Sequence, residues 1–429
     1  MASIRTVRKC PWCGDLVRLA FAPIVATNVV GAPTDAELPG GALGGGEFSF
    51  DDEFTIDDME GFDSVELTAP AEFVPHIERA VPISGAEVLG HAGDLPIVAA
   101  PQVAEKDERR LFGWMSAKPL IPVSERADAR DLPARACTSC HRPLPNDIDE
   151  RDVLILGVLG INRAGKTYLL ATALAEALQH DALAPAGITN FAADEATSHR
   201  FHRDYYLPVF RKRNRLDPTQ DPAEGDSVEP LIFRLEVDGK PFLLALHDLA
   251  GEAIAEPRRR AVIAPFIAHA DAVAFVVDPL EIEAVRSNLP LDQVTVDWRG
   301  WSQVDVLRAC IATLGEAAAT TPVSVVVTKS DLLGLAEGRR FQFAKAAPDA
   351  DWLDDQYAVD REVRELLRTW DAGQFEVEAA HAARGFFHAV SAFGAPPTDP
   401  TVPGVIRPVR VADPLGTLIR LVAEARGTR

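Results

Sequence analysis

Basic residues are scarce in this sequence of 429 residues, which has 43 lysines and arginines against 64 aspartates and glutamates and a net charge of −21. Because such a chain repels polyanions, we expect no general binding of nucleic acid or of anionic membranes. No apolar run is long enough to cross a bilayer, and the N-terminus lacks the apolar core of a signal peptide. We therefore expect a cytoplasmic protein without a membrane span.

Lysine and arginine are absent between residues 31 and 78, where thirteen acidic residues occur with many glycines. A segment of this composition cannot bury enough apolar surface to offset the entropy of ordering it. We expect an acidic, partly disordered insertion that acts as a solvated linker. Its interspersed phenylalanines leave open the alternative of a docking segment for a basic partner.

Cysteine is rare, but four of the five cysteines form two CxxC pairs, which are Cys10 with Cys13 and Cys137 with Cys140. Four thiolates satisfy tetrahedral Zn²⁺, so we predict one structural zinc in a zinc-ribbon-like region at residues 1–150, although 123 residues separate the pairs. His141 is a substitute ligand, and a redox CxxC or a metal shared by two chains are the alternatives. The fifth cysteine, Cys310, lies in a predicted helix and is expected to be a small core residue.

The stretch from 152 to 180 carries the strongest functional pattern. An apolar run at 153–159 predicts a buried strand, and GINRAGKT at 160–167 fits GxxxxGK[ST] before an amphipathic helix. In this pattern backbone N–H groups surround phosphate oxygens, Lys166 reaches the outer phosphates and the Thr167 hydroxyl binds Mg²⁺. The pattern therefore predicts a nucleotide site that contains Gly160, Asn162, Arg163, Ala164, Gly165, Lys166 and Thr167.

Strand and helix patterns alternate after this site. Residues 231–237 alternate apolar and polar side chains, which predicts a strand at the edge of a sheet, and Asp238-Gly239 predicts a type I′ hairpin into an apolar strand at 241–248. Further buried strands begin at 272, 323 and 385, and helices are predicted at 301–314, 360–370 and 415–425. We expect an α/β domain at 151–429 with a doubly wound, mostly parallel sheet, an antiparallel edge strand and ligands at the carboxyl ends of the strands.

With GINRAGKT, DLAG at 248–251, TKSD at 328–331 and Ser391-Ala392 in this order, the chain from about residue 152 onward resembles the translation-factor-related (TRAFAC) clade of P-loop GTPases. The zinc-knuckle N-terminus is similar to that of bacterial double-GTPase proteins associated with conflict systems. The resemblance implies GTP or GDP, Mg²⁺ and Zn²⁺ as cofactors. It also implies that Asp248 holds Mg²⁺ through water, that the Gly251 amide senses the terminal phosphate, and that guanine is bound by Thr328, Lys329, Asp331, Ser391 and Ala392.

The chemistry of the guanine motif agrees with that assignment, since a carboxylate accepts from the N1 and N2 donors of guanine, which adenine lacks. Departures from the family pattern concern hydrolysis. Glu252 stands where related proteins orient water with glutamine, so we expect slow turnover. A switch threonine should precede the strand at 231–237, and Thr219 is better placed than Thr189 or Thr197. Arginines 258–260 can meet phosphate, although such a run more often begins a solvated helix.

Two functions follow from these patterns. The leading hypothesis is a GTPase that hydrolyses GTP slowly and acts as a switch for a protein effector or a second GTPase, in a bacterial conflict or defence system. The alternative is a zinc-dependent adaptor or scaffold that binds nucleotide without significant hydrolysis. A nucleic-acid-binding zinc ribbon is disfavoured, because the chain has no basic stripe with interleaved aromatic residues.

Overall fold

The computed structural model describes residues 7–18, 24–25, 90–92, 95–99, 134–212, 229–289, 302–338, 341–344, 351–395 and 406–427. The chain divides into two compact units, one of residues 1–6 and 18–146 and one of residues 7–17 and 147–429. The acidic insertion predicted at 31–78 and the switch threonine Thr219 lie outside the described residues.

The first unit contains a small four-stranded sheet in the order β4-β5-β3-β6. All its pairings are antiparallel. Its strands are β3 (Ile24–Val25), β4 (Gly90–Ala92), β5 (Leu95–Ala99) and β6 (Ala134–Arg135). Strand β5 lies within the apolar stretch LPIVAAPQV, where two branched side chains and neighbouring prolines favour a short extended segment.

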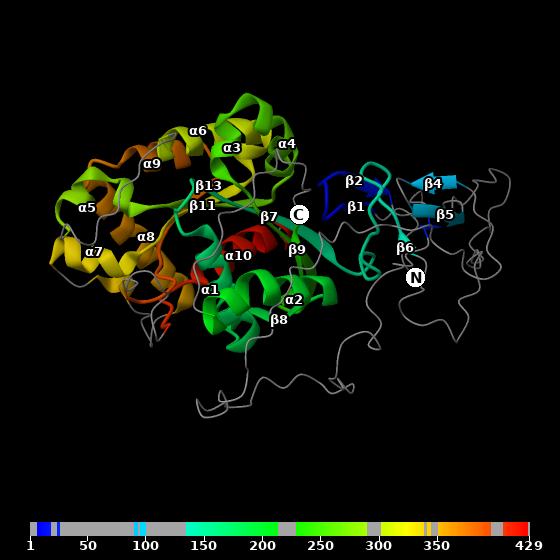
Figure 1. Ribbon diagram of the computed structural model, residues 1–429, viewed down its shortest axis with the longest axis horizontal. Helices are drawn as coiled ribbons and strands as arrows, with labels where there is room; N and C mark the ends of the chain where they lie inside the picture. Colours follow the sequence, from blue (N-terminus) through cyan, green and yellow to red (C-terminus); the bar gives the residue numbers. More distant parts are fainter. Residues whose placement is uncertain are drawn as a thin grey trace, which may run out of the picture. The chain divides into compact units, whose positions relative to one another are not determined.

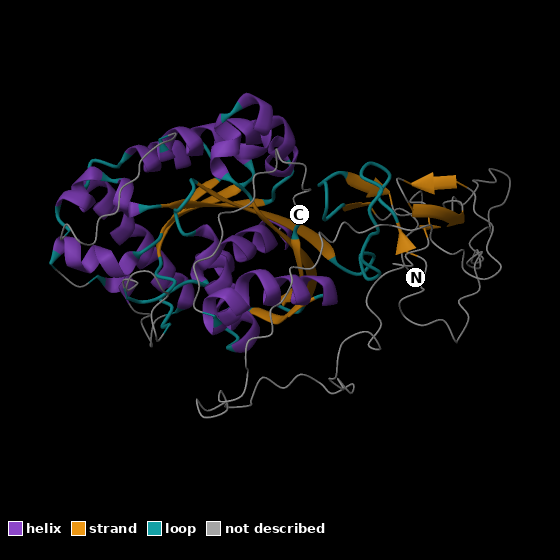
Figure 2. Ribbon diagram, viewed as in Figure 1, coloured by secondary structure: helices purple, strands orange, loops and turns teal. Residues whose placement is uncertain are grey.

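The second unit is built on a seven-stranded sheet in the order β13-β12-β11-β7-β10-β9-β8 (Figures 1 and 2). The strands from β13 to β10 run parallel, and β9 pairs antiparallel with both of its neighbours. The strands are β7 (Asp152–Gly160), β8 (Ile188–Ala193), β9 (Leu231–Val237), β10 (Lys240–Asp248), β11 (Ala272–Val277), β12 (Pro322–Val327) and β13 (Arg384–Ala389). The fold is therefore the mostly parallel α/β sheet that the sequence predicts.

The edge of this sheet differs from the prediction. The alternation of polar and apolar residues in β9 predicts a strand at the edge, yet β8 pairs with it and forms the edge. Half-buried Arg234 and Glu236 account for the alternation on β9 without an open edge. The Asp238-Gly239 hairpin is confirmed, because both residues have positive φ angles of 49° and 77°, as a type I′ turn requires.

Ten helices are described in the second unit. They are α1 (Lys166–Gln179), α2 (Glu195–Phe201), α3 (Gly251–Ala255), α4 (Pro257–Ala268), α5 (Glu283–Ser287), α6 (Gln303–Leu314), α7 (Ser330–Glu337), α8 (Trp352–Thr369), α9 (Gln374–Ala379) and α10 (Asp413–Gly427). A π-helix at His202–Arg211 continues α2. Helix α8 begins well before the predicted residue 360, because the Asp351 carboxylate accepts hydrogen bonds from Leu353 N and Asp354 N and caps it there.

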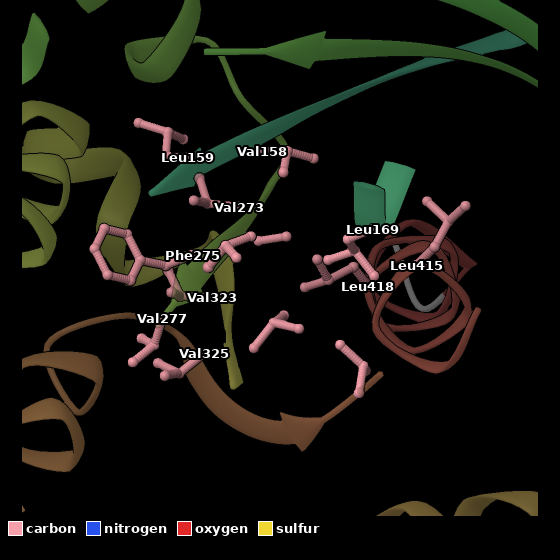
Figure 3. Packing of buried hydrophobic residues seen from close by; sticks show 14 of the residues in the cluster. Val158, Leu159, Leu169, Val273, Phe275, Val277, Val323, Val325, Leu415 and Leu418 are labelled. Atoms are coloured by element: carbon pink, nitrogen blue, oxygen red, sulfur yellow. The ribbon is translucent and has the colours of Figure 1, made fainter. Parts of the chain in front are cut away.

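The helices cover both faces of the sheet, with α1 and α10 on one face and α3, α4 and α6 on the other (Figures 1 and 2). Figure 3 shows Leu169 of α1 beside Leu415 and Leu418 of α10 on one side of the strands, while Phe275 and Val325 point to the opposite side. Both faces of the central strands are therefore buried, which explains their nearly unbroken apolar sequences. Cys310 is fully buried in α6, as predicted for a core residue.

Residues 7–17 are anchored in the second unit by charged contacts. They include β1 (Val7–Lys9), which pairs with β2 (Leu16–Arg18). The Lys9 ammonium lies 2.6 Å from the Asp271 carboxylate and donates to the His269 carbonyl. Asp271 also accepts from the Ile155 amide and pairs with Arg426 of α10. The first CxxC pair is thus held at the end of the sheet where β11 begins.

A buried polar chain ties α10 to the sheet. The Ser324 hydroxyl lies 2.7 Å from His388 Nδ1, and His388 Nε2 lies 3.1 Å from the Thr417 hydroxyl. Burial, reinforced by the charge of Arg410, lowers the pKa of His388 to about 3. The imidazole is therefore neutral in the folded protein at all ordinary pH values.

We expect this histidine to make the fold sensitive to acid. Between pH 6.5, the ordinary histidine pKa, and about pH 3 the unfolded chain binds a proton at His388 that the folded chain does not, so stability falls as the pH drops through this window. The contribution lost between pH 7 and pH 5 is roughly 2 kcal/mol. Urea unfolding midpoints of the unaltered protein and of His388→Asn at both pH values measure it. The exposed His180→Asn variant is the control, and equal pH slopes for all three proteins would contradict the prediction.

Candidate functional site

Five loops meet at the carboxyl ends of the parallel strands. They follow β7, β10, β11, β12 and β13, and they include the sequences GINRAGKT, DLAG, TKSD and Ser391-Ala392. Strand order reverses at β7, which has β11 on one side and β10 on the other. Ligands of doubly wound sheets bind at such a point, outside the carboxyl ends of the strands. The topology thus brings all the predicted nucleotide-site segments to one end of the sheet.

The loop after β7 wraps around a buried lysine. The ammonium of Lys166, which is 4% exposed, donates to the carbonyls of Gly160 and Ile161 at 2.7 and 3.0 Å. Asn162 and Arg163 are exposed at the tip of the loop. Gly165 precedes α1 with a φ angle of 89°, a conformation that glycine adopts without strain. The loop therefore places a positive charge and the N-terminus of α1 together, as phosphate binding requires.

The loop after β10 touches the phosphate loop directly. A Cβ atom added to Gly251 would lie 2.5 Å from the Gly160 carbonyl oxygen, so only glycine fits there. Asp248 ends β10 in register with Val158, and the Leu249 amide donates to the Val158 carbonyl. Asp248 and Thr167 are thus supplied by neighbouring segments, and a carboxylate with a hydroxyl suits hard Mg²⁺.

The loops after β12 and β13 join each other through Asp331. The Ser391 hydroxyl donates to Asp331 Oδ1 at 2.5 Å, and the Gly394 amide donates back to the Ser391 hydroxyl at 2.8 Å. Burial raises the pKa of Asp331, while the bond from Ser391 opposes that shift. Asp331 and Ser391 are therefore brought together, and Ala392 is half-buried beside them.

Thr328 connects the loop after β12 to the loop after β7. Its hydroxyl donates to the Ala164 carbonyl at 2.7 Å and lies 3.1 Å from the Val277 carbonyl. The threonine is buried, and a Cβ on Gly165 would contact it at 3.6 Å. Threonine in TKSD thus provides a hydroxyl that fixes the distance between the two halves of the site.

Sequence reasoning missed Asp278, which follows β11 and forms a 2.6 Å ion pair with the Lys329 ammonium. The side chain of Gln303 in α6 holds the Asp278 backbone through two hydrogen bonds. It accepts from the Asp278 amide at 2.7 Å and donates to the Asp278 carbonyl at 3.0 Å. Lys329 itself has a positive φ angle of 53°. A carboxylate placed directly after an apolar strand is the signal that could have identified Asp278.

Sequence reasoning also missed Tyr205, which lies in the π-helix. Burial and the negative charge of Asp248 raise the pKa of the Tyr205 phenol, and the charge of Arg200 opposes this shift. π-Helices are rare and occur often at functional sites. The stretch before β9, in which the sequence predicts a switch threonine, thus contains β8, α2 and a π-helix whose Tyr205 has its pKa raised by burial and by the charge of Asp248.

Two of the three candidate switch threonines form contacts outside the five site loops. Thr189 pairs with Glu236, near the end of β9 that leads into the hairpin away from the site loops. Thr197 is buried, and its hydroxyl accepts a 2.8 Å hydrogen bond from the Ile232 amide. Thr219 and the side chains of Glu252 and Arg258 lie outside the described part of the chain. Arg259 pairs with Glu256 and Arg260 donates to the Ile254 carbonyl, as expected for a local helix start.

A buried ion cluster supports the loop that carries Ser391. Ser391 forms an antiparallel bridge with Val409, and the next residue, Arg410, has a 4% exposed side chain. Its guanidinium contacts Asp355 at 2.6 Å and Asp413 at 2.9 Å and donates to the Phe343 carbonyl. Because a buried guanidinium needs all these acceptors, the cluster holds Val409 in one place against Ser391.

The four paired cysteines form one cluster in which all Sγ atoms lie within 4.8 Å of one another. The two CxxC turns have the same backbone pattern: Cys10 and Cys137 each donate to the carbonyl five residues on and accept from the amide four residues on. The residues at that fourth position, Gly14 and His141, both have positive φ angles, of 81° and 61°. The cluster of cysteines excludes His141, which is exposed and shapes its turn. Four thiols at this spacing suit tetrahedral zinc.

Taken together, these groups suit phosphate, a divalent cation and a purine base. Backbone N–H groups and Lys166 can neutralise phosphate, and Thr167 and Asp248 supply oxygen ligands for Mg²⁺. Asp331 offers two acceptor oxygens to a base with neighbouring N–H donors. Positioning and charge neutralisation are also what phosphoryl transfer requires of a protein.

Among the described residues, no helix is both long and apolar enough to cross a membrane. In sequence, the chain is 27% identical over 352 residues to a protein of Mycolicibacterium smegmatis (strain ATCC 700084 / mc(2)155) named "Putative ESX-1 scaffolding and assembly protein SaeC". The match covers 74% of this chain and 89% of that protein.

A solved structure of the bacterial selenocysteine-specific elongation factor EF-Sec matches 63% of the chain at 14% identity with a TM-score of 0.27. This chain spans only 29% of that protein's length. The family model of Double-GTPase 2 matches residues 154–381, which is more than half of the chain and includes the loops after β7, β10, β11 and β12. The protein therefore belongs to the Double-GTPase 2 family.

Proposed function

We propose that the protein binds GTP at the five-loop site, hydrolyses it slowly and signals its nucleotide state to a protein partner. Family membership supports GTP binding. The observation that carries the proposal is the Thr328 hydroxyl bond to Ala164, because it joins the phosphate loop to the segment that holds Asp331. One ligand that has both a polyphosphate and a guanine base would satisfy both halves.

The proposed roles of the site residues follow their positions. Gly160 to Thr167 bind the phosphates, with Lys166 at the outer ones, and Thr167 with Asp248 holds Mg²⁺. Thr328, Lys329, Asp331, Ser391 and Ala392 bind guanine. The hydroxyl of Ser391 aims Asp331, and the ion pair with Asp278 orients Lys329.

Slow hydrolysis is proposed because Glu252 follows Gly251 where a neutral amide would align water. A carboxylate at this position would add negative charge beside the phosphates of a bound nucleotide, so we expect turnover well below typical enzyme rates of about 1–10³ s⁻¹. A partner arginine, or Arg163 at the exposed loop tip, would then stabilise the developing charge. Arginine fingers of this kind raise rates by about 10³–10⁵.

The switch is proposed for two segments that flank Asp248. The contact between Gly251 and Gly160 supports a direct response of the DLAG loop to the terminal phosphate. The charge coupling of Tyr205 to Asp248 supports a response of α2 and the π-helix. Thr219 remains the proposed switch threonine. Binding of GTP and Mg²⁺ would order both segments and hydrolysis would release them.

Hydrogen exchange tests the switch. Residues 190–225 and 248–262 should be better protected with a non-hydrolysable GTP analogue than with GDP, while residues 360–369 of α8 should not change. Phosphate release under multiple turnover tests the hydrolysis. Identical protection in the two nucleotide states would mean that the domain is not a switch, whatever its affinity for GTP.

A second candidate function is a scaffold that binds nucleotide without significant hydrolysis. The name of the Mycolicibacterium relative, a scaffolding and assembly protein, favours it. Both candidates imply a protein partner, an effector or a second GTPase. The placement in a bacterial conflict or defence system is tested by the genes encoded beside this one, since an effector nuclease or second GTPase there would support it.

We also propose that Cys10, Cys13, Cys137 and Cys140 hold one structural zinc. The 4.8 Å cluster within one chain supports this over a metal shared between chains. Metal analysis should find one zinc per chain, and Cys13→Ser and Cys137→Ser should each lose it, because a closed tetrahedral site needs every ligand.

The matched control for these variants is Cys310→Ala, which removes a thiol from the core and should keep the zinc. Nucleotide affinity should stay the same in all three variants. Protein purified under reducing conditions without chelators that contains no zinc would contradict the proposal, as would a variant of either CxxC pair that keeps its metal.

A further inference from the structure

Two aromatic rings meet across the candidate site. Tyr168, in the first turn of α1, and Phe393, in the loop after β13, have ring centroids 5.0 Å apart with an interplanar angle of 71°. Both residues are half-buried. They lie 225 positions apart in the sequence, and neither belongs to the motifs that predict the nucleotide site.

The pair spans the two halves of that site. Tyr168 directly follows Thr167, the residue that ends the phosphate loop, and Phe393 lies two residues after Ser391, which donates to Asp331. In the proposed nucleotide site, a ligand that reaches from the phosphate loop to Asp331 spans these two halves. The edge-to-face contact joins a residue beside each of them.

Phe393 is held in place by its backbone neighbours. Its carbonyl accepts a 3.0 Å hydrogen bond from the Arg407 amide, and the following amide, of Gly394, donates to the Ser391 hydroxyl. A ring on such a fixed backbone loses little conformational freedom when a ligand binds against it. An edge-to-face pair also leaves ring surface on which a planar base or a ribose can lie.

We propose that Tyr168 and Phe393 form an aromatic wall that binds the nucleoside part of a nucleotide. The proposal rests on the proposed nucleotide site and adds a contact that takes no part in choosing the base. Aromatic surface attracts any nucleoside, so the wall raises affinity for GDP and GTP alike, whereas Asp331 distinguishes guanine from adenine. It gives no affinity for bare polyphosphate.

The experiment measures equilibrium binding of GDP, GTP, ATP and inorganic tripolyphosphate to the full chain. Phe393→Ala should lower the affinities for GDP and GTP by the same factor, roughly 5- to 100-fold, and should raise the rate of GDP dissociation by a similar factor. The ratio of GTP to ATP affinity and the affinity for tripolyphosphate should stay at wild-type values. Tyr168→Ala should behave alike, and Tyr168→Phe and Phe393→Tyr, which keep both rings, should bind normally.

Val377→Ala, which trims an exposed apolar side chain of α9, is the matched control and should change nothing. Thermal unfolding separates binding losses from misfolding. Equal losses of GDP and tripolyphosphate affinity in Phe393→Ala would contradict the proposed aromatic wall, because they would indicate damage to the phosphate loop. Unchanged GDP affinity would overturn it as well. If the unaltered protein binds neither GDP nor GTP, the proposed function itself fails before the wall is tested.

Discussion

Replacing Asp331 by asparagine is expected to shift the base preference of the protein from guanine toward xanthine. The asparagine amide presents a donor where the carboxylate accepted from guanine, so a paired hydrogen bond is lost and a buried donor faces another donor. The binding free energy of GTP should become less favourable by roughly 1–3 kcal/mol or more, and the affinity for xanthosine triphosphate should rise. The Ser391 hydroxyl can still donate to the amide oxygen, so the loop itself should keep its position.

Competition binding with GTP, xanthosine triphosphate and ATP measures this shift. Asp305→Asn is the matched control, since it makes the same chemical change on the exposed surface of α6, beside Arg308. The unaltered protein should prefer GTP over ATP. Equal binding of GTP and ATP by the unaltered protein would remove the guanine assignment, and an unchanged preference in the variant would remove the role of Asp331.

Replacing Lys166 by alanine is expected to abolish multiple-turnover phosphate release and to weaken GTP binding by at least about 100-fold. The ammonium is buried at the centre of the phosphate loop, so its contact with a phosphate is poorly screened by solvent and contributes more than a surface contact. Lys166→Arg should not restore activity, because a planar, longer guanidinium does not fit the space that holds a compact ammonium between two carbonyls.

Phosphate release under excess GTP, with binding measured separately, tests this expectation. Lys240→Ala, at the exposed hairpin between β9 and β10, is the control and should retain full activity. The same measurement separates the two candidate functions. Phosphate release that the unaltered protein shows and Lys166→Ala lacks supports the GTPase, whereas an unaltered protein that binds GTP but releases no phosphate supports the scaffold.

Local patterns were sufficient to predict the phosphate loop, the buried strands and the β9–β10 hairpin. Each of these depends on neighbours in the sequence: an apolar run before GINRAGKT, or an Asp-Gly pair that accepts two positive φ angles. The same holds for each CxxC turn, whose backbone hydrogen bonds close within five residues. The sequence could also order the site loops, because parallel strands present their carboxyl ends together.

Long-range partners could be decided only by the tertiary structure. Strand β8 takes the edge of the sheet because its residues pair with β9 residues 40 to 49 positions later, and its own mixed sequence carries no strong strand pattern. Asp278 meets Lys329 across 51 positions, and Arg410 meets Asp355 across 55. Tyr168 reaches Phe393 because α1 begins where the loop after β13 lies.

By itself, therefore, the sequence determined which segments we propose to bind phosphate, metal and base, since those chemistries need particular residue types at short spacing. The tertiary structure decided which other side chains orient, neutralise and support the residues of those segments. A charged group or a ring becomes a partner only when folding brings it within a few ångströms. The spacing of the two residues along the sequence does not indicate that they will meet.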